Sequence, residues 1–205
     1  MKSLLFLGDS ITDCNHYFDP ENLGYGYVRM ISDKINAPDK DYQVRNLGND
    51  GFTISALRRL WKRNCLSVKP DFITILIGIN DLSVIKNTGI TPSVGLAQFR
   101  EQYQELIDEI RMITDYPILL MEPFIFPYPA EYATWEEDLH QMNRIIQELA
   151  KDNHLAFLPL WNPLLSAAKQ VGFREITTDG IHLTPYGHKI LMEQWANTLN
   201  DFSIC

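Results

Sequence analysis

The sequence has few cysteines and no long apolar run. Its three cysteines, Cys14, Cys65 and Cys205, are odd in number and widely spaced. A disulfide framework or a zinc knuckle needs closely spaced pairs, so we expect neither, and reduced thiols in a cytoplasm are the simplest interpretation. No stretch approaches the roughly 20 apolar residues of a membrane-spanning helix. The apolar run at residues 3–7 is also too short for a secretory signal, since Gly-Asp-Ser at 8–10 interrupts it.

Positive charge is scarce as well. Eighteen Lys and Arg residues stand against 26 Asp and Glu residues, which gives a net charge of −8. Nucleic acids and anionic membranes are bound through a positive surplus, so neither is an expected partner. The apolar fraction of 45% and the charged fraction of 21% are those of an ordinary globular protein. The chain length fits a single domain over residues 1–205.

Short apolar runs alternate with longer amphipathic stretches, which is typical of an α/β fold with a parallel sheet covered on both faces. The third run is almost wholly branched and apolar, as in a central strand. We expect five strands, at residues 3–7, 42–46, 72–77, 118–121 and 155–158. We expect helices at residues 25–35, 53–64, 94–114, 135–153 and 185–199, the last with Thr184 as its N-cap.

The unusual polar residues follow the predicted strands. Gly-Asp-Ser at 8–10 follows the first strand, residues 46–51 follow the second, and Gly-Ile-Asn-Asp at 78–81 follows the third. Asp-Gly-Ile-His at 179–182 precedes the final helix. Loops after the carboxyl ends of parallel strands share one edge of the sheet, where such folds bind ligands. We therefore expect these four segments to meet in one cleft.

Ser10 is the candidate nucleophile of that cleft. A serine hydroxyl needs a base to remove its proton, and the base needs an orienting partner. His182 and Asp179 supply this pair at a spacing of three residues. Alone, Ser10 would be interpreted as a helix cap, and a lone histidine as a structural hydrogen-bonding residue.

Gly51 and Asn80 are the candidate oxyanion-hole donors. A glycine lets its backbone N–H approach a substrate closely, and an asparagine amide can donate directly from the end of a central strand. The alternative for Gly51 is an ordinary turn glycine. For Asn80 it is an Asx-turn in which Asp81 acts as a cap.

These segments resemble the SGNH (GDSL-type) hydrolases over nearly the whole chain. The four family motifs appear in order: Gly-Asp-Ser-Ile-Thr at 8–12, Asn-Leu-Gly-Asn-Asp-Gly-Phe-Thr at 46–53, Gly-Ile-Asn-Asp at 78–81 and Asp-Gly-Ile-His at 179–182. The resemblance implies a three-layer α/β/α, flavodoxin-like fold with a five-stranded parallel sheet.

The resemblance also implies a role for each motif residue. Ser10 would be the nucleophile, with His182 as its base and Asp179 orienting that base. The oxyanion hole would consist of the N–H groups of Ser10 and Gly51 and the amide of Asn80.

Two residues depart from the family pattern. Ile11 stands where the motif has leucine, and Asp50 stands where a serine often precedes the oxyanion-hole glycine. Asp50 must point away or be paired for Gly51 to serve as a donor.

The segments at 11–14, 23–28 and 77–82 resemble intracellular acetylxylan-type esterases, which implies acetyl esters of carbohydrates as substrates and a homo-oligomer. Two long aromatic loops, at 13–24 and 123–134, either line the site or cover the sheet edge. Candidate substrate-binding residues are Asp9, Phe124 and Ile181, although the ordinary role of Asp9 is to brace the serine loop.

Other interpretations fit the sequence less well. An α/β-hydrolase needs Gly-x-Ser-x-Gly, and residue 12 is Thr12. No nucleotide-binding glycine loop occurs, so no cofactor is expected. A metal site could be drawn from Asp9, Asp13, His16, His182 and His188. Their spacing matches no recognisable ligand pattern, so no metal is expected. We expect His188 on the face of the last helix, and His140 and His154 at the surface.

Two further functions remain as alternatives. A lysophospholipase or thioesterase would act on longer acyl chains with the same catalytic residues. A flavodoxin-like binding module would have kept the fold and lost turnover. The expected partner in each enzyme case is a small-molecule ester.

Overall fold

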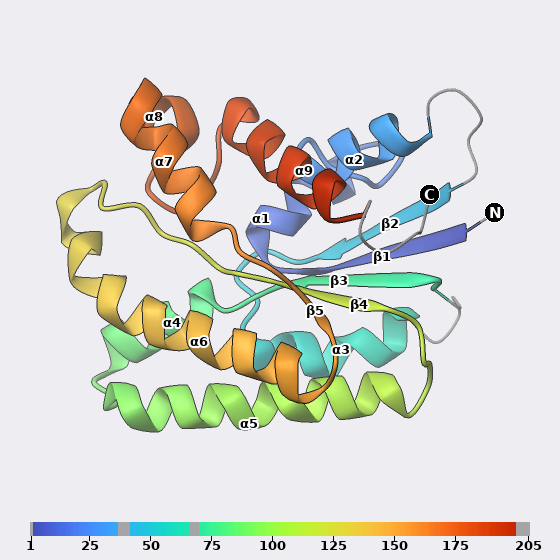
Figure 1. Cartoon of the computed structure of the whole chain (residues 1–205), viewed down its shortest axis with the longest axis horizontal. Coiled ribbons are helices and arrows are strands. Elements are labelled where there is room, and N and C mark those ends of the chain that lie inside the picture. The colour runs from blue at the N-terminus through green and yellow to red at the C-terminus, as the bar shows by residue number, and fades with distance from the viewer. Residues whose placement is uncertain (1, 37–41, 66–69, 200–205) are drawn as a thin grey trace.

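A parallel five-stranded sheet lies between two layers of helices in the computed structural model (Figure 1). The structure describes residues 2–36, 42–65 and 70–199. The strands are β1 (Lys2–Gly8), β2 (Tyr42–Gly48), β3 (Phe72–Leu76), β4 (Ile118–Met121) and β5 (Ala156–Leu158). They pair in the order β2-β1-β3-β4-β5, each pair parallel. This order is that of flavodoxin-like folds, so the predicted fold class is confirmed.

Helices cover both faces of the sheet (Figure 1). One layer contains α3 (Ile54–Cys65), α4 (Ile79–Thr88), α5 (Pro92–Arg111) and α6 (Glu136–Asp152). The other contains α1 (Ser10–Asp13), α2 (Tyr27–Ile35), α7 (Trp161–Val171), α8 (Phe173–Ile176) and α9 (Pro185–Leu199). Two 3₁₀ helices, η1 (His16–Phe18) and η2 (Ala130–Trp135), lie in the long loops. No helix among the described residues is long and apolar enough to span a membrane.

All five predicted strands and all five predicted helices are present. The bounds of α9 are those predicted, and Thr184 caps it, since its hydroxyl oxygen accepts the N–H of Gly187 at 3.1 Å. The sequence did not predict α1, α4, α7 or α8. In α7 a proline, Pro163, lies at the third helical position, where no intrahelical N–H bond is made.

The carboxyl ends of the strands lie at the left-hand edge of the sheet in Figure 1. The chain leaves β1 into α1 and β3 into α4, and these two helices lie on opposite faces of the sheet. Neighbouring strands whose connections diverge in this way leave a crevice between them, which is where ligands bind in open α/β sheets. The segments after β1 and β3 are those with Ser10 and Asn80.

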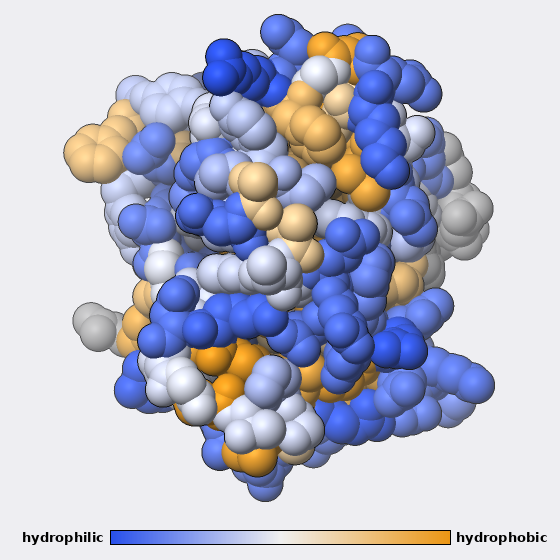
Figure 2. All heavy atoms as spheres, turned by 90° about the vertical axis from the view of Figure 1, so that its left-hand side faces the viewer, coloured by the Kyte–Doolittle hydropathy of each residue, from blue (hydrophilic) through white to orange (hydrophobic). Residues whose placement is uncertain are grey.

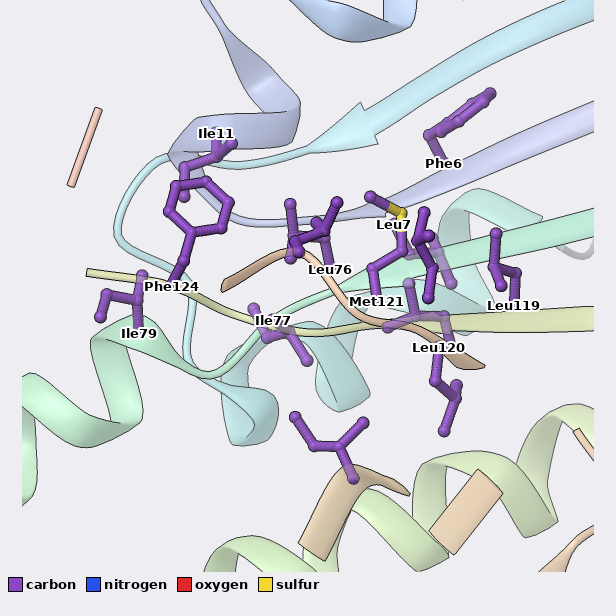
Figure 3. Packing of buried hydrophobic residues seen from close by; sticks show 14 of the residues in the cluster. Phe6, Leu7, Ile11, Leu76, Ile77, Ile79, Leu119, Leu120, Met121 and Phe124 are labelled. Atoms are coloured by element: carbon purple, nitrogen blue, oxygen red, sulfur yellow. The ribbon is translucent and has the colours of Figure 1, made fainter. Parts of the chain in front are cut away.

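The apolar core continues from the strands into the segments that follow them (Figure 3). The buried side chains labelled in the figure are Phe6, Leu7, Leu76, Leu119, Leu120 and Met121 in the strands, and Ile11, Ile77, Ile79 and Phe124 beyond their ends. Each fully buried side chain of this kind contributes about 1.5–3 kcal/mol. The segments that follow the strands are therefore anchored to the core.

Candidate active site

Ser10 is held at the point where β1 turns into α1. The carboxylate of Asp9 caps that helix, because its Oδ1 accepts the N–H of Ile11 at 3.0 Å. Gly8 allows the tight turn, since a Cβ at this position would lie 2.3 Å from Thr12 Oγ1 and 2.5 Å from the carbonyl oxygen of Leu76. Ser10 is thus the first residue of a helix that follows a central strand.

The structure brings Ser10, His182 and Asp179 together. Ser10 Oγ lies 2.9 Å from His182 Nε2, although the two residues are 172 positions apart in the chain. His182 Nδ1 lies 2.6 Å from Asp179 Oδ2. If Nδ1 carries the proton, it donates to Asp179, and Nε2 accepts from the serine hydroxyl. This is the geometry in which an imidazole can remove a proton from a nucleophile.

The carboxylate of Asp179 is ionised and well oriented. Partial burial raises its pKa, but hydrogen bonds from the ring of His182 and from the N–H groups of His182 and Ile181 outweigh this and hold the pKa below its usual value. Those two backbone N–H groups donate to Asp179 Oδ1 at 2.8 and 2.9 Å. Both side chains of the pair are about half exposed (47% for His182 and 50% for Asp179), so a substrate can reach the imidazole.

The two candidate oxyanion-hole donors lie on adjoining segments. Gly51 is exposed with a φ of +71°, and a Cβ there would meet no atom within 4 Å. The backbone conformation, not lack of space, therefore requires glycine. Asn80 is in the first turn of α4, and its Nδ2 donates to the carbonyl oxygen of Phe52 at 3.0 Å. An amide nitrogen carries two N–H groups, so one is left to donate to a substrate.

Asp81 does not cap the turn of Asn80, as one alternative for that segment required. Both of its carboxylate oxygens accept the N–H of Ile54, at 3.0 and 3.2 Å, at the start of α3. Burial raises the pKa of Asp81 to about 7. Asp81 therefore fixes α3 against α4, and leaves the Asn80 amide to its bond with Phe52.

A cavity of about 380 Å³ opens beside Ser10 and His182. Its other lining residues come from the first aromatic loop, from the segment after β2 and from α9 with the residues before it: Ile11, Asp13, Cys14, Asn15, Asp50, Leu183 and His188. Figure 2 views the molecule from this edge of the sheet, and its surface there is mostly hydrophilic, with separate hydrophobic patches. A larger hollow of about 660 Å³ along α6 contains none of Ser10, His182 and Asp179.

Asp50 borders the cavity and is exposed. Its backbone N–H donates to Asp13 Oδ2 at 3.1 Å. Its carboxylate makes no hydrogen bond to any residue that the structure describes, so of the two conditions that the sequence analysis named, pairing is not met there. The role of Gly51 stays a prediction.

Two of the three candidate substrate-binding residues are placed elsewhere. Asp9 is 1% exposed and bonds to the backbone, and burial raises its pKa to about 7. Phe124 is completely buried in the core. Neither side chain offers a surface to a substrate, so these two assignments are wrong, and Asp9 has the bracing role given as the alternative. Ile181 is partly buried, next to His182, and stays a candidate.

The two aromatic loops have different roles. The first contributes Asp13, Cys14 and Asn15 to the cavity wall. In the second, Phe124 and Phe126 are completely buried, so that this part of the loop covers the sheet. Tyr17 in the first loop is 67% exposed.

His188 was expected on the helix face but is buried, with 4% exposed. Its Nδ1 accepts the N–H of Tyr27 at the start of α2 (3.2 Å), and its Nε2 lies 3.6 Å from Cys14 Sγ. Burial, with a smaller contribution from the charge of His182, lowers the pKa of His188 to about 4. His188 thus links α9 to α2 and to the end of α1 as a neutral ring. No local pattern reveals this role, because its partners are about 160 positions or more away.

The remaining histidines are paired or exposed. His16 is buried against Asp13, whereas His140 and His154 are exposed as predicted. Within the part of the chain that the structure describes, no three His, Cys, Asp or Glu side chains group in a way that could hold a metal ion.

Comparison with known proteins finds relatives that are all lipases, acylhydrolases or esterases. A family model of GDSL-like lipases and acylhydrolases matches residues 6–190. The acetylxylan esterase of Geobacillus stearothermophilus is 28% identical over 204 residues, which cover 93% of this chain and 90% of that enzyme. An isoamyl acetate-hydrolysing esterase 1 homologue of Mus musculus is 25% identical over 209 residues, covering 92% of this chain and 77% of the relative.

Solved structures are similar over nearly the full chain. The crystal structure of the Geobacillus stearothermophilus acetylxylan esterase has a TM-score of 0.83 at 26% identity, covering 96% of this chain and 93% of the other. A protein of Parabacteroides merdae described as a GDSL-like lipase has a TM-score of 0.88 at 24% identity, covering 97% and 95%.

The buried His188 predicts a loss of stability in acid. Its pKa is about 4 in the fold against 6.5 for a free histidine. As the pH falls from about 6.5 to 4, the unfolded chain binds a proton that the folded chain does not, which removes up to about 3 kcal/mol of unfolding free energy. Urea unfolding of wild type and His188→Gln at pH 7 and pH 4.5 measures this contribution. We expect a smaller decrease in the variant.

The exposed His140 provides the control for this measurement. His140→Gln should keep the wild-type decrease between the two pH values. An equal decrease in His188→Gln and wild type would contradict a neutral, buried His188.

Proposed function

This chain belongs to the GDSL-like lipase/acylhydrolase family and is an ester hydrolase, and we propose that Ser10 is its nucleophile, His182 its general base and Asp179 the group that orients the base. The observation that carries this proposal is the 2.9 Å distance between Ser10 Oγ and His182 Nε2. Structures of the Geobacillus stearothermophilus acetylxylan esterase include catalytic mutants at a serine, an aspartate and a histidine. That aspartate and histidine are three positions apart, as are Asp179 and His182.

Hydrolysis proceeds in two steps through an acyl-enzyme. Ser10 Oγ attacks the acyl carbon while His182 Nε2 takes its proton, and Asp179 stabilises the resulting imidazolium. The N–H groups of Ser10 and Gly51 and the free N–H of the Asn80 amide stabilise the oxyanion. The tetrahedral intermediate then expels the alcohol, which receives the proton from His182. Water, activated by the same imidazole, attacks the acyl-enzyme and releases the acid.

The substrates we propose are acetyl esters of carbohydrates. The named activities of both relatives, acetylxylan and isoamyl acetate hydrolysis, concern acetate esters. The cavity of about 380 Å³ is small, and its polar lining residues Asn15 and Asp50 can bond to sugar hydroxyls. Its apolar wall is short, since Ile11 and Leu183 supply most of it. A long acyl chain would need a longer apolar channel, which disfavours the lysophospholipase or thioesterase alternative.

The first test concerns the triad. We expect Ser10→Ala and His182→Ala each to lower turnover of p-nitrophenyl acetate at least about a thousandfold, and the double variant to be less than tenfold worse than either. A fluorophosphonate should label wild-type Ser10 covalently. His140→Ala is the control and should keep wild-type activity. Additive losses, or labelling at another residue, would contradict the assignment.

The second test concerns the oxyanion hole. Asn80→Ala should lower kcat on the order of a hundredfold with little change in KM, because its amide acts mainly on the charge that develops in the transition state. Asn87→Ala, at an exposed position of the same helix, is the matched control. A loss of less than threefold in Asn80→Ala would remove Asn80 from the oxyanion hole.

The third test concerns the substrate. Among p-nitrophenyl esters we expect kcat/KM to be highest for acetate and to fall by at least tenfold at eight carbons, because the cavity is short. An acetylated xylooligosaccharide should be a better substrate than isoamyl acetate, since only the sugar can bond to the polar wall. A maximum at eight carbons or more would instead support the lysophospholipase or thioesterase alternative.

A further inference from the structure

A turn in which an aspartate carboxylate bonds to the histidine three residues later occurs twice near the cavity. In one copy Asp179 accepts the N–H of His182 at 2.8 Å and its ring Nδ1 at 2.6 Å. In the other, Asp13 Oδ1 accepts the N–H of His16 at 3.0 Å and its ring Nδ1 at 2.6 Å. His16 is only 4% exposed, so it cannot serve a substrate as His182 does. The second copy must have another role.

The second oxygen of Asp13 reaches the turn that contains Gly51. Asp13 Oδ2 accepts the N–H of Asp50 at 3.1 Å. A second residue of the loop at 13–24 also contacts this turn, since the hydroxyl of Tyr17 donates to Asn49 Oδ1 at 3.1 Å. Asp13 also lines the cavity beside Ser10. One carboxylate therefore connects the buried His16 to the residue before the candidate oxyanion-hole donor.

Two backbone hydrogen bonds hold the ends of the turn, since the N–H of Asn49 donates to the carbonyl oxygen of Gly8 at 3.1 Å and the N–H of Phe52 to that of Asn49 at 3.2 Å. Packing adds little support to the residues between them. Gly51 is exposed at a positive φ, with no atom within 4 Å of where a Cβ would lie, and Asp50 is exposed as well. A carboxylate free to rotate would hold the Asp50 N–H weakly. The two hydrogen bonds from His16 fix the rotation of Asp13 and leave Oδ2 aimed at that N–H.

We propose that Asp13, held by His16, is a positioning residue that fixes the 49–51 turn so that the N–H of Gly51 points at the developing oxyanion. This inference rests on the proposed function. Asp13 touches no reacting atom, and it acts through the backbone of Asp50.

The test replaces Asp13 with asparagine, which has the same shape but only one acceptor oxygen. We expect kcat on p-nitrophenyl acetate to fall about ten- to a hundredfold with KM changed less than twofold, because the lost interaction belongs to the transition state. The affinity for a boronic acid, whose tetrahedral adduct imitates that state, should fall by a similar factor. His16→Gln keeps the Asp13 carboxylate and its bond from the backbone N–H of residue 16 but removes the bond from the ring, and should give a smaller loss in both measurements.

Asp19→Asn is the matched control. Asp19 is buried in the same loop, accepts the N–H groups of Leu23 and Gly24 and pairs with Arg29, but it has no bond to the 49–51 turn. If Asp13 acted only on the general stability of the loop, Asp19→Asn would reproduce its effect on kcat, and this result would overturn the proposal.

A readout that does not depend on activity completes the test. We expect the Asp50 amide proton to exchange with solvent at least tenfold faster in Asp13→Asn, as measured by NMR, and at the wild-type rate in Asp19→Asn. Unchanged exchange in Asp13→Asn, or an unchanged kcat in an active protein, would overturn this inference alone. A wild-type protein that neither turns over p-nitrophenyl acetate nor reacts with a fluorophosphonate would contradict the proposed function instead.

Discussion

The position of α9 relative to the sheet decides whether Ser10 and His182 can meet. Ser10 is fixed to β1, whereas His182 lies just before α9, so their 2.9 Å contact exists only if α9 is held in one place. Two buried hydrogen bonds hold it. Trp195 Nε1 donates to Thr74 Oγ1 in β3 at 3.1 Å, and His188 accepts the N–H of Tyr27. The residues that anchor α9 therefore help to place His182 beside Ser10.

Buried carboxyl groups form the layer directly beneath the site. Asp9 caps the helix of Ser10, and Asp81 caps α3 from the first turn of α4, where Asn80 lies. Burial raises the pKa of both to about 7. Each accepts one backbone N–H, from Ile11 and Ile54 respectively, at the start of a helix, where no intrahelical partner exists. These residues hold the segments of Ser10 and Asn80 in place without facing the cavity.

The sequence could predict what depends on local pattern. Apolar runs located the five strands, helical spacing located α5, and the cap residue Thr184 located the start of α9. The rule that loops after parallel strands share one edge of the sheet predicted that the segments of Ser10, Asn80 and His182 meet there. The sequence could not predict the burial of Phe124, the bond between His188 and Tyr27, or the cap that Asp81 gives to α3. These depend on contacts between distant segments, and a single sequence without its fold contains no periodic signal for them.

The carboxylate of Asp50, which bonds to no residue that the structure describes, adds a negative charge beside the cavity. Together with Asp13 in the wall and the overall charge of −8, it makes the entrance electronegative. Phospholipids, acyl phosphates and coenzyme A thioesters carry phosphate groups that this field repels. Uncharged alcohols such as sugars are not repelled by this field. Ionic strength should therefore affect anionic esters far more than neutral ones.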